Sequence, residues 1–218
     1  MDTTESTDQS PRRRASQRKA QFEQRCQRFV EVAEELFLSH GFAGTSVNKV
    51  VAIAGGSLAT LYAEFRNKDE LFEAVMKRRA ARLFAAMVTP GTEGGLQAIL
   101  DSMARRMLDH MLSDEALSVY RLVITEGPRF PAVRNAVLQN GWDPFLNNLA
   151  SQFKELADRY GWAVADTRVA AELFLTLVQG QTRTLAAWGF ADRFTPEQRA
   201  ADAKRAVQQF LKVYPLTA

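Results

Sequence analysis

Hydrophobic residues recur at helical spacing in several short segments near the start of the chain, and turn residues separate them. The first segment ends before Gly41, a residue type expected just past the end of a helix. Its apolar residues share one helical face: Phe22, Cys26, Phe29, Val30, Ala33 and Phe37. Residues 22–76 therefore predict three short amphipathic helices followed by the start of a longer one.

The break between the second and third of these helices has the spacing of a helix-turn-helix. Thr45 or Ser46 caps the second helix, Ala54-Gly55-Gly56 forms the turn, and Ser57 caps a third helix over residues 58–65. The second helix of such a pair is suited to enter the major groove of DNA. A capping box at Asn67-Lys68-Asp69-Glu70 then starts the fourth helix.

The rest of the chain predicts further helices, with breaks at glycine and proline. The fourth helix should end near Val88, before Thr89-Pro90-Gly91. Later helices are expected at residues 94–112, 114–125, 133–139, 144–160 and 166–189, and a capping box at Thr195-Pro196-Glu197-Gln198 starts the last one. The prediction is an all-α fold of about nine helices. We expect a flexible basic arm at residues 1–20, a helix-turn-helix domain at 21–66, and a connecting helix with a ligand-binding and dimerisation domain at 67–218.

The helix-turn-helix region resembles the DNA-binding domain of the TetR family of bacterial transcriptional regulators. The shared pattern consists of Ala33, Leu36-Phe37, Gly41-Phe42, Thr45-Ser46-Val47, Ala52, Ala54-Gly55, Ser57, Thr60-Leu61-Tyr62, Phe65 and Lys68-Asp69-Glu70-Leu71. A second segment is similar to the AefR-like group of TetR C-terminal domains, through Tyr120-Arg121-Leu122-Val123 and Glu126-Gly127-Pro128-Arg129-Phe130-Pro131.

The third helix and its surroundings supply the expected DNA contacts. Ser57, Thr60 and Tyr62 carry groups that reach DNA, and Leu58 and Ala59 are suited only to thymine methyl groups or sugars. The resemblance implies phosphate contacts for Tyr62 and Lys68. Thr45 and Ser46, which belong to the shared pattern, complete the set.

Three residues depart from the family pattern in this region. Leu58 replaces the frequent Lys or Arg, and Ala59 replaces the usual Gly. Glu64 stands where the family often has His or another phosphate-contacting residue, and its carboxylate would repel a phosphate.

Positive charge concentrates at the start of the chain. Residues 1–90 carry 14 Lys and Arg against 11 Asp and Glu, whereas residues 91–218 carry 14 of each. Between Ser10 and Arg28, seven basic residues stand against Glu23 alone. Such an arm suits phosphates or an adjacent minor groove, and the alternative is a solvated tail.

The C-terminal half offers candidates for a ligand pocket. Met103, Met107 and Met111 recur every four residues, which is typical of plain core and also of an adaptable pocket wall. The further candidates are Phe84, His110, Tyr120, Val123, Phe130, Trp142, Phe145 and Phe174. Arg106, Arg121 and Arg129 are candidates for binding an acidic group or are surface charges.

The last two long helices are apolar enough to need a partner surface. In the TetR family they pair with their copies, which implies a homodimer interface here; the alternative is burial within one chain. The expected interface residues are Leu173, Leu177, Gln181, Leu185, Val207 and Phe210.

Little in the sequence favours catalysis or a cofactor. His40 and His110 are the only histidines, Cys26 is the only cysteine, and no metal-ligand cluster, nucleophile elbow or phosphate-binding loop is present. We therefore expect no enzyme, no metal and no cofactor. No apolar stretch has the length of a membrane span and the first residues do not resemble a signal peptide, so a cytoplasmic protein is expected.

These features together favour a TetR-like regulator that binds a palindromic operator in double-stranded DNA as a homodimer. It is expected to act as a repressor and to be released by a small apolar ligand. One alternative is a ligand-binding helical protein with weakened DNA binding, suggested by Leu58 and Glu64. Another is an architectural DNA-binding protein without a ligand.

Overall fold

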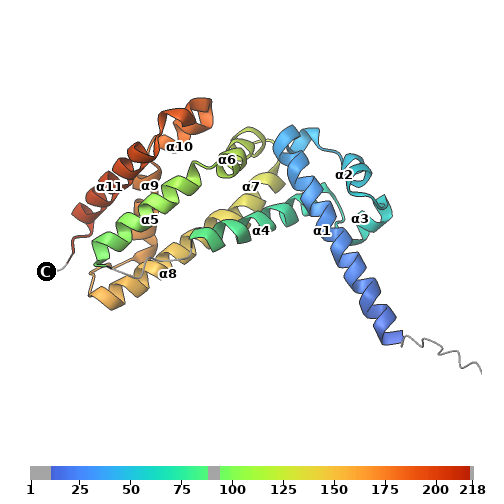
Figure 1. Ribbon diagram of the computed structural model, residues 1–218, viewed down its shortest axis with the longest axis horizontal. Helices are drawn as coiled ribbons and strands as arrows, with labels where there is room; N and C mark the ends of the chain where they lie inside the picture. The colour runs from blue at the N-terminus through green and yellow to red at the C-terminus, as the bar shows by residue number, and fades with distance from the viewer. Residues whose placement is uncertain (1–10, 88–93, 217–218) are drawn as a thin grey trace, which may run out of the picture. The chain divides into compact units, whose positions relative to one another are not determined.

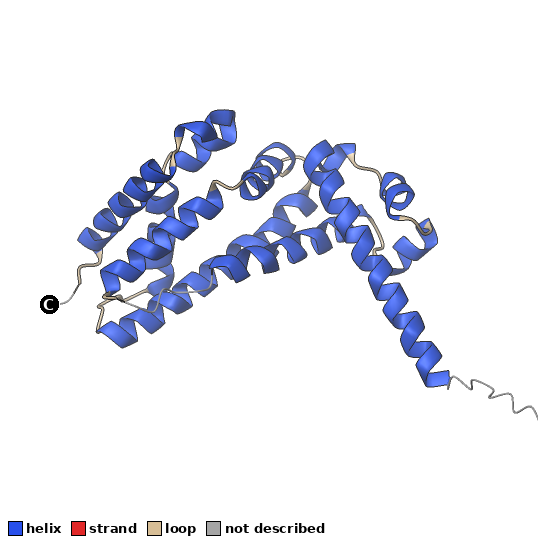
Figure 2. Ribbon diagram, viewed as in Figure 1, coloured by secondary structure: helices blue, strands red, loops and turns tan. Residues whose placement is uncertain are grey.

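The computed structural model describes the backbone of residues 11–87 and 94–216, and the side chains of these ranges except 11, 12, 14 and 80–87. This part of the chain consists of helices and connecting loops, without a strand (Figures 1 and 2). The α-helices are α1 (Pro11–Gly44), α2 (Val47–Ala54), α3 (Leu58–Glu64), α4 (Lys68–Met87), α5 (Leu96–Met111), α6 (Asp114–Glu126), α7 (Pro131–Val137), α8 (Asp143–Tyr160), α9 (Thr167–Gln179), α10 (Thr182–Leu185) and α11 (Pro196–Val213). Two π-helical segments, η1 (Leu138–Trp142) and η2 (Ala186–Phe190), and a 3₁₀ segment, η3 (Ala191–Arg193), complete the chain.

The all-α prediction is confirmed, and most helix boundaries lie within a few residues of those expected. The number of helices in the described residues is close to the nine expected, and the segment expected to be one helix over residues 166–189 is broken. Gly180, with φ 45° and ψ −139°, ends α9, and a single turn of helix, α10, follows it. The capping box at Thr195 is confirmed, since the Thr195 N–H donates to Gln198 Oε1 at 2.9 Å and the Gln198 N–H donates to Thr195 Oγ1 at 3.3 Å.

The chain divides into two compact units, residues 1–75 and 76–218, and the division falls within α4. This differs from the expected boundary at residue 66, because Leu71, Phe72 and Val75 on the first turns of α4 are buried residues of unit 1. The expected flexible arm also differs from the structure, because α1 is helical from Pro11. Proline at the first helical position followed by Arg, Ala, Gln and Lys suits a helix. Residues 1–10 lie outside the described part.

Three aromatic rings form the centre of unit 1. Phe37 lies 5.6 Å from Phe42 and 5.0 Å from Phe72, and Phe42 lies 5.2 Å from Phe72, measured between ring centroids. Gly41 makes this possible, since φ 74° interrupts α1 and turns Phe42 back towards Phe37. The cluster thereby joins the end of α1 to the start of α4.

Unit 2 has a core built from α5, α8, α9 and α11. The α11 helix packs against α5 and α9, and α8 packs against α9. Phe210 lies 5.0 Å from Phe174 and 5.8 Å from Trp162, and Phe153 lies 5.3 Å from Phe174. These edge-to-face rings fill the space between the helices.

This core corrects part of the predicted dimer interface. Val207 and Phe210 are fully buried within the single chain, so their side chains do not face a partner. Leu173, Leu177 and Leu185 are half-buried, and Gln181 is exposed. The apolar face of α11 predicts an intersubunit surface, but α5 and α9 of the same chain already cover it.

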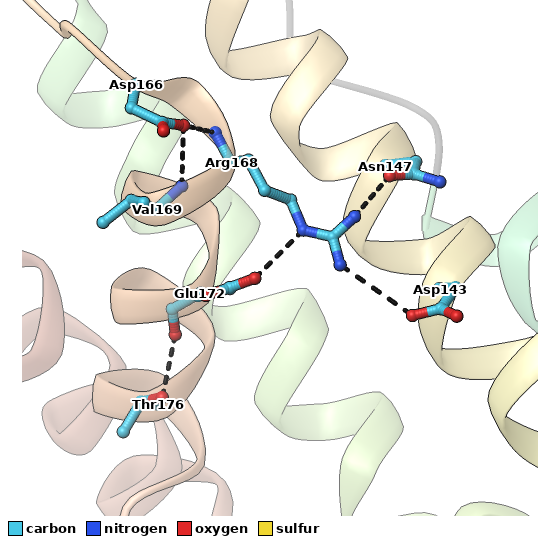
Figure 3. A network of polar contacts seen from close by, with 7 residues as sticks. All are labelled: Asp143, Asn147, Asp166, Arg168, Val169, Glu172 and Thr176. Atoms are coloured by element: carbon cyan, nitrogen blue, oxygen red, sulfur yellow. Dashed lines mark hydrogen bonds and ion pairs between the residues drawn. The ribbon is translucent and has the colours of Figure 1, made fainter.

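A polar network fixes α9 against α8 at the edge of this core (Figure 3). Asp166 caps α9 by accepting from the Arg168 and Val169 N–H groups at 2.9 and 3.1 Å. The Arg168 guanidinium donates to Asn147 and to Glu172 Oε1 at 3.0 Å, and pairs with Asp143 at 3.8 Å. One arginine thus connects two neighbouring helices through three side chains.

Phe210 is the residue whose role changes most between sequence and structure. Phe210→Ala should lower the free energy of unfolding by about 3–5 kcal/mol, because it empties the centre of the core of unit 2. Val213→Ala, on the same helix with a side chain that is 59% exposed, should change it by less than about 0.5 kcal/mol. Urea denaturation followed by circular dichroism measures both. Equal effects of the two substitutions would contradict the core assignment.

Candidate DNA-binding site

The helix-turn-helix turn is fixed by two glycines with left-handed φ. Gly55 has φ 78° and Gly56 has φ 102°. A Cβ atom on Gly56 would lie 3.0 Å from Arg25 Nη1 and 3.3 Å from the Phe29 ring, so the turn lies directly against α1. Ser57 then caps α3, since its hydroxyl accepts from the Thr60 N–H at 3.1 Å.

The α3 helix has one buried side and one open side. Leu61 and Phe65 are buried against the unit, whereas Ala59 is exposed, Leu58 is 38% exposed and Tyr62 is 48% exposed. Thr60 is half-buried, and its hydroxyl lies 2.9 Å from the exposed Ser57 hydroxyl. The structure thus brings the predicted contacts of α3 together on one accessible side, with the hydroxyls of Ser57 and Thr60 hydrogen-bonded to each other.

Thr45 and Ser46 differ in burial, since Ser46 is exposed and Thr45 is buried. Ser46 is exposed and caps α2 by accepting from the Lys49 N–H at 3.2 Å. Thr45 is only 3% exposed, and its hydroxyl donates to the carbonyls of Leu36 at 3.0 Å and Gly41 at 2.9 Å. Thr45 therefore closes the end of α1, and its buried side chain is not available for the predicted DNA contact.

Two lysines near the helix-turn-helix have their ammonium groups against the end of α1. Lys68 begins α4, with its ammonium 4.4 Å from the Phe42 ring centroid and 3.5 Å from the Ala43 carbonyl oxygen. Lys49 on α2 approaches His40 Nε2 at 3.0 Å. Asn67 caps α4 by accepting from the Glu70 N–H at 2.9 Å, as the sequence predicts. Both ammonium groups lie near the end of α1, where α2 and α4 meet it.

Glu64 is the negative residue at the end of α3. It is exposed, and within the described residues it has neither a hydrogen bond nor an ion pair through its side chain. Its carboxylate acts on α1: burial raises the pKa of the Cys26 thiol, and the charge of Glu64 raises it further. The exposed end of α3 therefore carries a negative charge without an ion-pair partner among the described residues, and Cys26 is a buried thiol, as the sequence predicts.

The predicted ligand pocket of unit 2 does not form one lining. Met103, Met107 and Met111 are buried in the hydrophobic core, and Phe174 is fully enclosed by Phe153 and Phe210. Trp142 is 39% exposed in η1, and Phe145 packs against the core from its edge. The Phe84 side chain lies outside the described residues. Of the remaining candidates, His110, Tyr120 and Val123 are half-buried, and so is Phe130.

Two arginines of unit 2, Arg79 and Arg183, have surroundings that the sequence does not predict. Arg79 on α4 is 2% exposed and binds Glu115 through both the carbonyl at 3.1 Å and the carboxylate at 3.2 Å. Arg183 on α10 is half-buried and lies over the Tyr120 ring, 4.2 Å from its centroid. Arg79 belongs to a Lys-Arg-Arg run that is typical of a solvated face. Arg183 is a charged residue within the largely apolar segment 166–189, and this contrast is visible in the sequence.

Metal clusters and membrane-spanning helices are both absent from the described ranges. Residues 11–87 and 94–216 hold no group of three or more His, Cys, Asp or Glu placed to bind a metal ion. None of the helices described is long and apolar enough to cross a bilayer.

Family models match both units. Residues 29–75 match the bacterial regulatory proteins of the tetR family, and residues 98–215 match the C-terminal domain of AefR-like transcriptional repressors. The second match alone covers more than half of the 218 residues.

Individual relatives agree with this result. The chain is 46% identical over 57 residues to the HTH-type transcriptional repressor ComR of Escherichia coli, an alignment that covers 26% of this chain and 27% of ComR. Alignments with the other curated relatives span 57% and 50% of those proteins.

Solved structures extend the similarity over both units. A TetR-family transcriptional regulator from Mesorhizobium loti MAFF303099 has a TM-score of 0.78 at 25% identity, covering 88% of this chain and 98% of that one. The flavonoid-responsive regulator FrrA has a TM-score of 0.78 at 28% identity, covering 89% and 100%. The chain belongs to the TetR family of bacterial regulatory proteins, and its second unit is an AefR-like C-terminal domain.

Proposed function

We propose that this protein is a transcriptional repressor that binds a palindromic operator as a homodimer and is released by a small ligand. The observation that carries the proposal is the open side of α3 in a tetR-type unit, which is followed in the same chain by an AefR-like domain. We further infer a binding role without catalysis, exercised in the cytoplasm where an operator is accessible.

The open side of α3 is suited to a duplex in a particular way. Leu58 and Ala59 present small apolar surfaces that fit thymine methyl groups, and Thr60 offers a hydroxyl or methyl to a base edge. We expect Tyr62 and Lys68 to contact phosphates, and the N-terminus of α4 favours an anion beside Lys68. Phosphate contacts fix the register, and base contacts select the sequence.

A palindromic site requires two copies of α3 related by a twofold axis. Leu173, Leu177 and Leu185 are half-buried on α9 and α10, with Leu173 and Leu177 packed at the edge of the core, and the exposed Gln181 lies between Leu177 and Leu185 in the sequence. Trp188 is exposed in the segment that follows. This surface supports a homodimer through α9 and the segment after it, without Val207 and Phe210 of α11.

A ligand in unit 2 is supported by the AefR-like match and by the name of FrrA, a flavonoid-responsive regulator. The methionine stripe does not add to this support, because it is packed in the core. A second candidate function, ligand binding with weakened DNA binding, is favoured by the exposed Glu64 and by Leu58 in place of a cation.

The first test measures binding of the protein to the DNA upstream of its own gene. Fluorescence anisotropy should give a complex of two chains per duplex that weakens steeply with salt. Lys68→Ala should weaken binding to operator and random DNA by the same factor, about 1 kcal/mol, because it removes an interaction with a phosphate. Lys212→Ala, an exposed lysine of unit 2, is the matched control and should leave affinity unchanged. Salt-independent or absent binding would favour the second candidate function.

A substitution at Glu64 tests whether the C-terminal end of α3 lies near the DNA backbone. Glu64→Lys should strengthen binding by about 1 kcal/mol at low salt, on specific and random DNA alike, because it replaces repulsion of a phosphate by attraction. The gain should shrink at high salt. Glu155→Lys, on the exposed side of α8 in unit 2, is the control for the change in net charge. Equal or weaker binding by Glu64→Lys would show that this carboxylate does not face the backbone.

The N-terminal part of α1 supports a further DNA contact. In residues 11–25, six Lys or Arg stand against Glu23 alone. Every side chain described between residues 13 and 25 is exposed, and Cys26 is the first buried one. Arg25 lies against Gly56 at the turn that precedes α3, so the helix leaves the unit beside the recognition helix. A basic helix with exposed side chains at this position is suited to phosphates next to the operator half-site.

Neutralising this helix should reduce the salt dependence of DNA binding. The triple variant Arg13→Gln, Arg18→Gln, Lys19→Gln should flatten the slope of log K against log salt by about 0.9 for each phosphate that these side chains neutralise. The control triple variant is Lys154→Gln, Lys204→Gln, Lys212→Gln, three exposed lysines of unit 2. Both are measured on one duplex at several salt concentrations. Identical slopes would make the basic helix a bystander.

A further inference from the structure

Arg183 is a half-buried charge in unit 2 for which the described structure provides no acid. Its guanidinium lies 4.2 Å from the centre of the Tyr120 ring, and Nη1 donates to Gln179 Oε1 at 3.5 Å, the limit of a hydrogen bond. The Nε atom is buried and makes no hydrogen bond within the described residues. A guanidinium normally uses its planar set of donors on a carboxylate or phosphate, and the described residues offer Arg183 only the Gln179 amide and the Tyr120 ring.

The surroundings hold Arg183 in this place. Arg121 Nε donates to the Ala187 carbonyl at 2.8 Å and Nη2 to the Ala186 carbonyl at 3.1 Å, which joins α6 to η2. These bonds keep Tyr120, the neighbour of Arg121 on α6, beside α10. The break at Gly180 starts α10 with a new direction. Arg183 is thus positioned by the elements around it and is not a loose surface side chain.

The ionisable groups described near Arg183 do not supply a free negative charge to balance its positive one. His110 lies near enough for the charge of Arg183 to lower its pKa, in addition to the larger lowering by burial. Burial also lowers the pKa of Arg183, which the Tyr120 hydroxyl opposes. Glu115, the acid that acts on His110, is already bound to Arg79 at 3.2 Å.

An unpaired cation that is partly removed from water is costly, and its cost falls when an anion binds beside it. We propose that Arg183 is the ionic partner of a small organic anion, a carboxylate or phenolate on an apolar body, held with Gln179 and the Tyr120 ring. The apolar body follows from the Tyr120 ring, which lies under the guanidinium. Tyr120, His110 and Arg183 are each half-buried, so the group remains reachable from solvent. This inference rests on the proposed function, in which unit 2 receives a ligand.

The test compares benzoate with benzamide, which has nearly the same shape and no charge. Titration calorimetry with the full chain should show binding of benzoate and at least about tenfold weaker binding of benzamide. Arg183→Met, which removes the charge and keeps the apolar stem, should weaken benzoate binding at least about tenfold. Arg193→Met removes an exposed arginine that lies over Phe190 in the same region, and it should leave benzoate binding unchanged.

Thermal unfolding of the free protein distinguishes a binding role from a structural one. Because Arg183→Met removes a half-buried cation that lacks an acid, the Tm of the free variant should be unchanged or raised by about 2–4 °C. A lower Tm would assign Arg183 to the fold. No benzoate binding by the wild type, equal binding of benzamide, or benzoate binding retained in Arg183→Met would each overturn the proposal. Operator binding without benzoate tests the proposed function separately, because Arg183→Met should retain it.

Discussion

The packing of Phe37, Phe42 and Phe72 is the interaction on which the DNA-binding unit depends. The α2 and α3 helices have 8 and 7 residues, too few to be stable alone in water. Their positions are set by the aromatic cluster, which joins the end of α1 to the start of α4, and by Thr45, which closes α1 from within. The φ of Gly41 is required for this arrangement, because Phe42 must turn back onto Phe37. The orientation of the accessible side of α3 is therefore set by the contacts of its buried side.

Aromatic packing also fixes the helices of unit 2, around a larger core. Phe210, Phe174, Phe153 and Trp162 occupy the space between α8, α9 and α11, and this consumes the most apolar face of α11. The surface that we propose for another copy of the chain consists of the half-buried leucines of α9 and α10, with Trp188 exposed after them. A helix with two apolar faces has two possible partners, and the interior of its own chain takes the more apolar face.

Arg79 and Arg183 are two arginines of unit 2 with different surroundings. Arg79 is nearly inaccessible, yet it binds both a carbonyl and a carboxylate of Glu115, so it connects α4 and α6. Arg183 is more accessible and has an aromatic ring and a distant amide as partners. Desolvation is costly for either charge. Arg79 has its acid, Glu115, within the chain, whereas the acid that we propose for Arg183 is a bound ligand.

The sequence by itself determined the local structure of this protein. The caps at Ser46, Ser57, Asn67 and Thr195 and the turns at Gly41 and Gly55 were all predictable, because capping and left-handed φ depend on a few consecutive residues. The tertiary structure alone decided which faces are covered. Thr45 is buried, the methionine stripe and Phe210 belong to the core, and Arg183 lies beside Tyr120. Periodicity marks a face as apolar but does not identify what covers it, because burial is settled by helices far apart in the chain that meet only in the folded molecule.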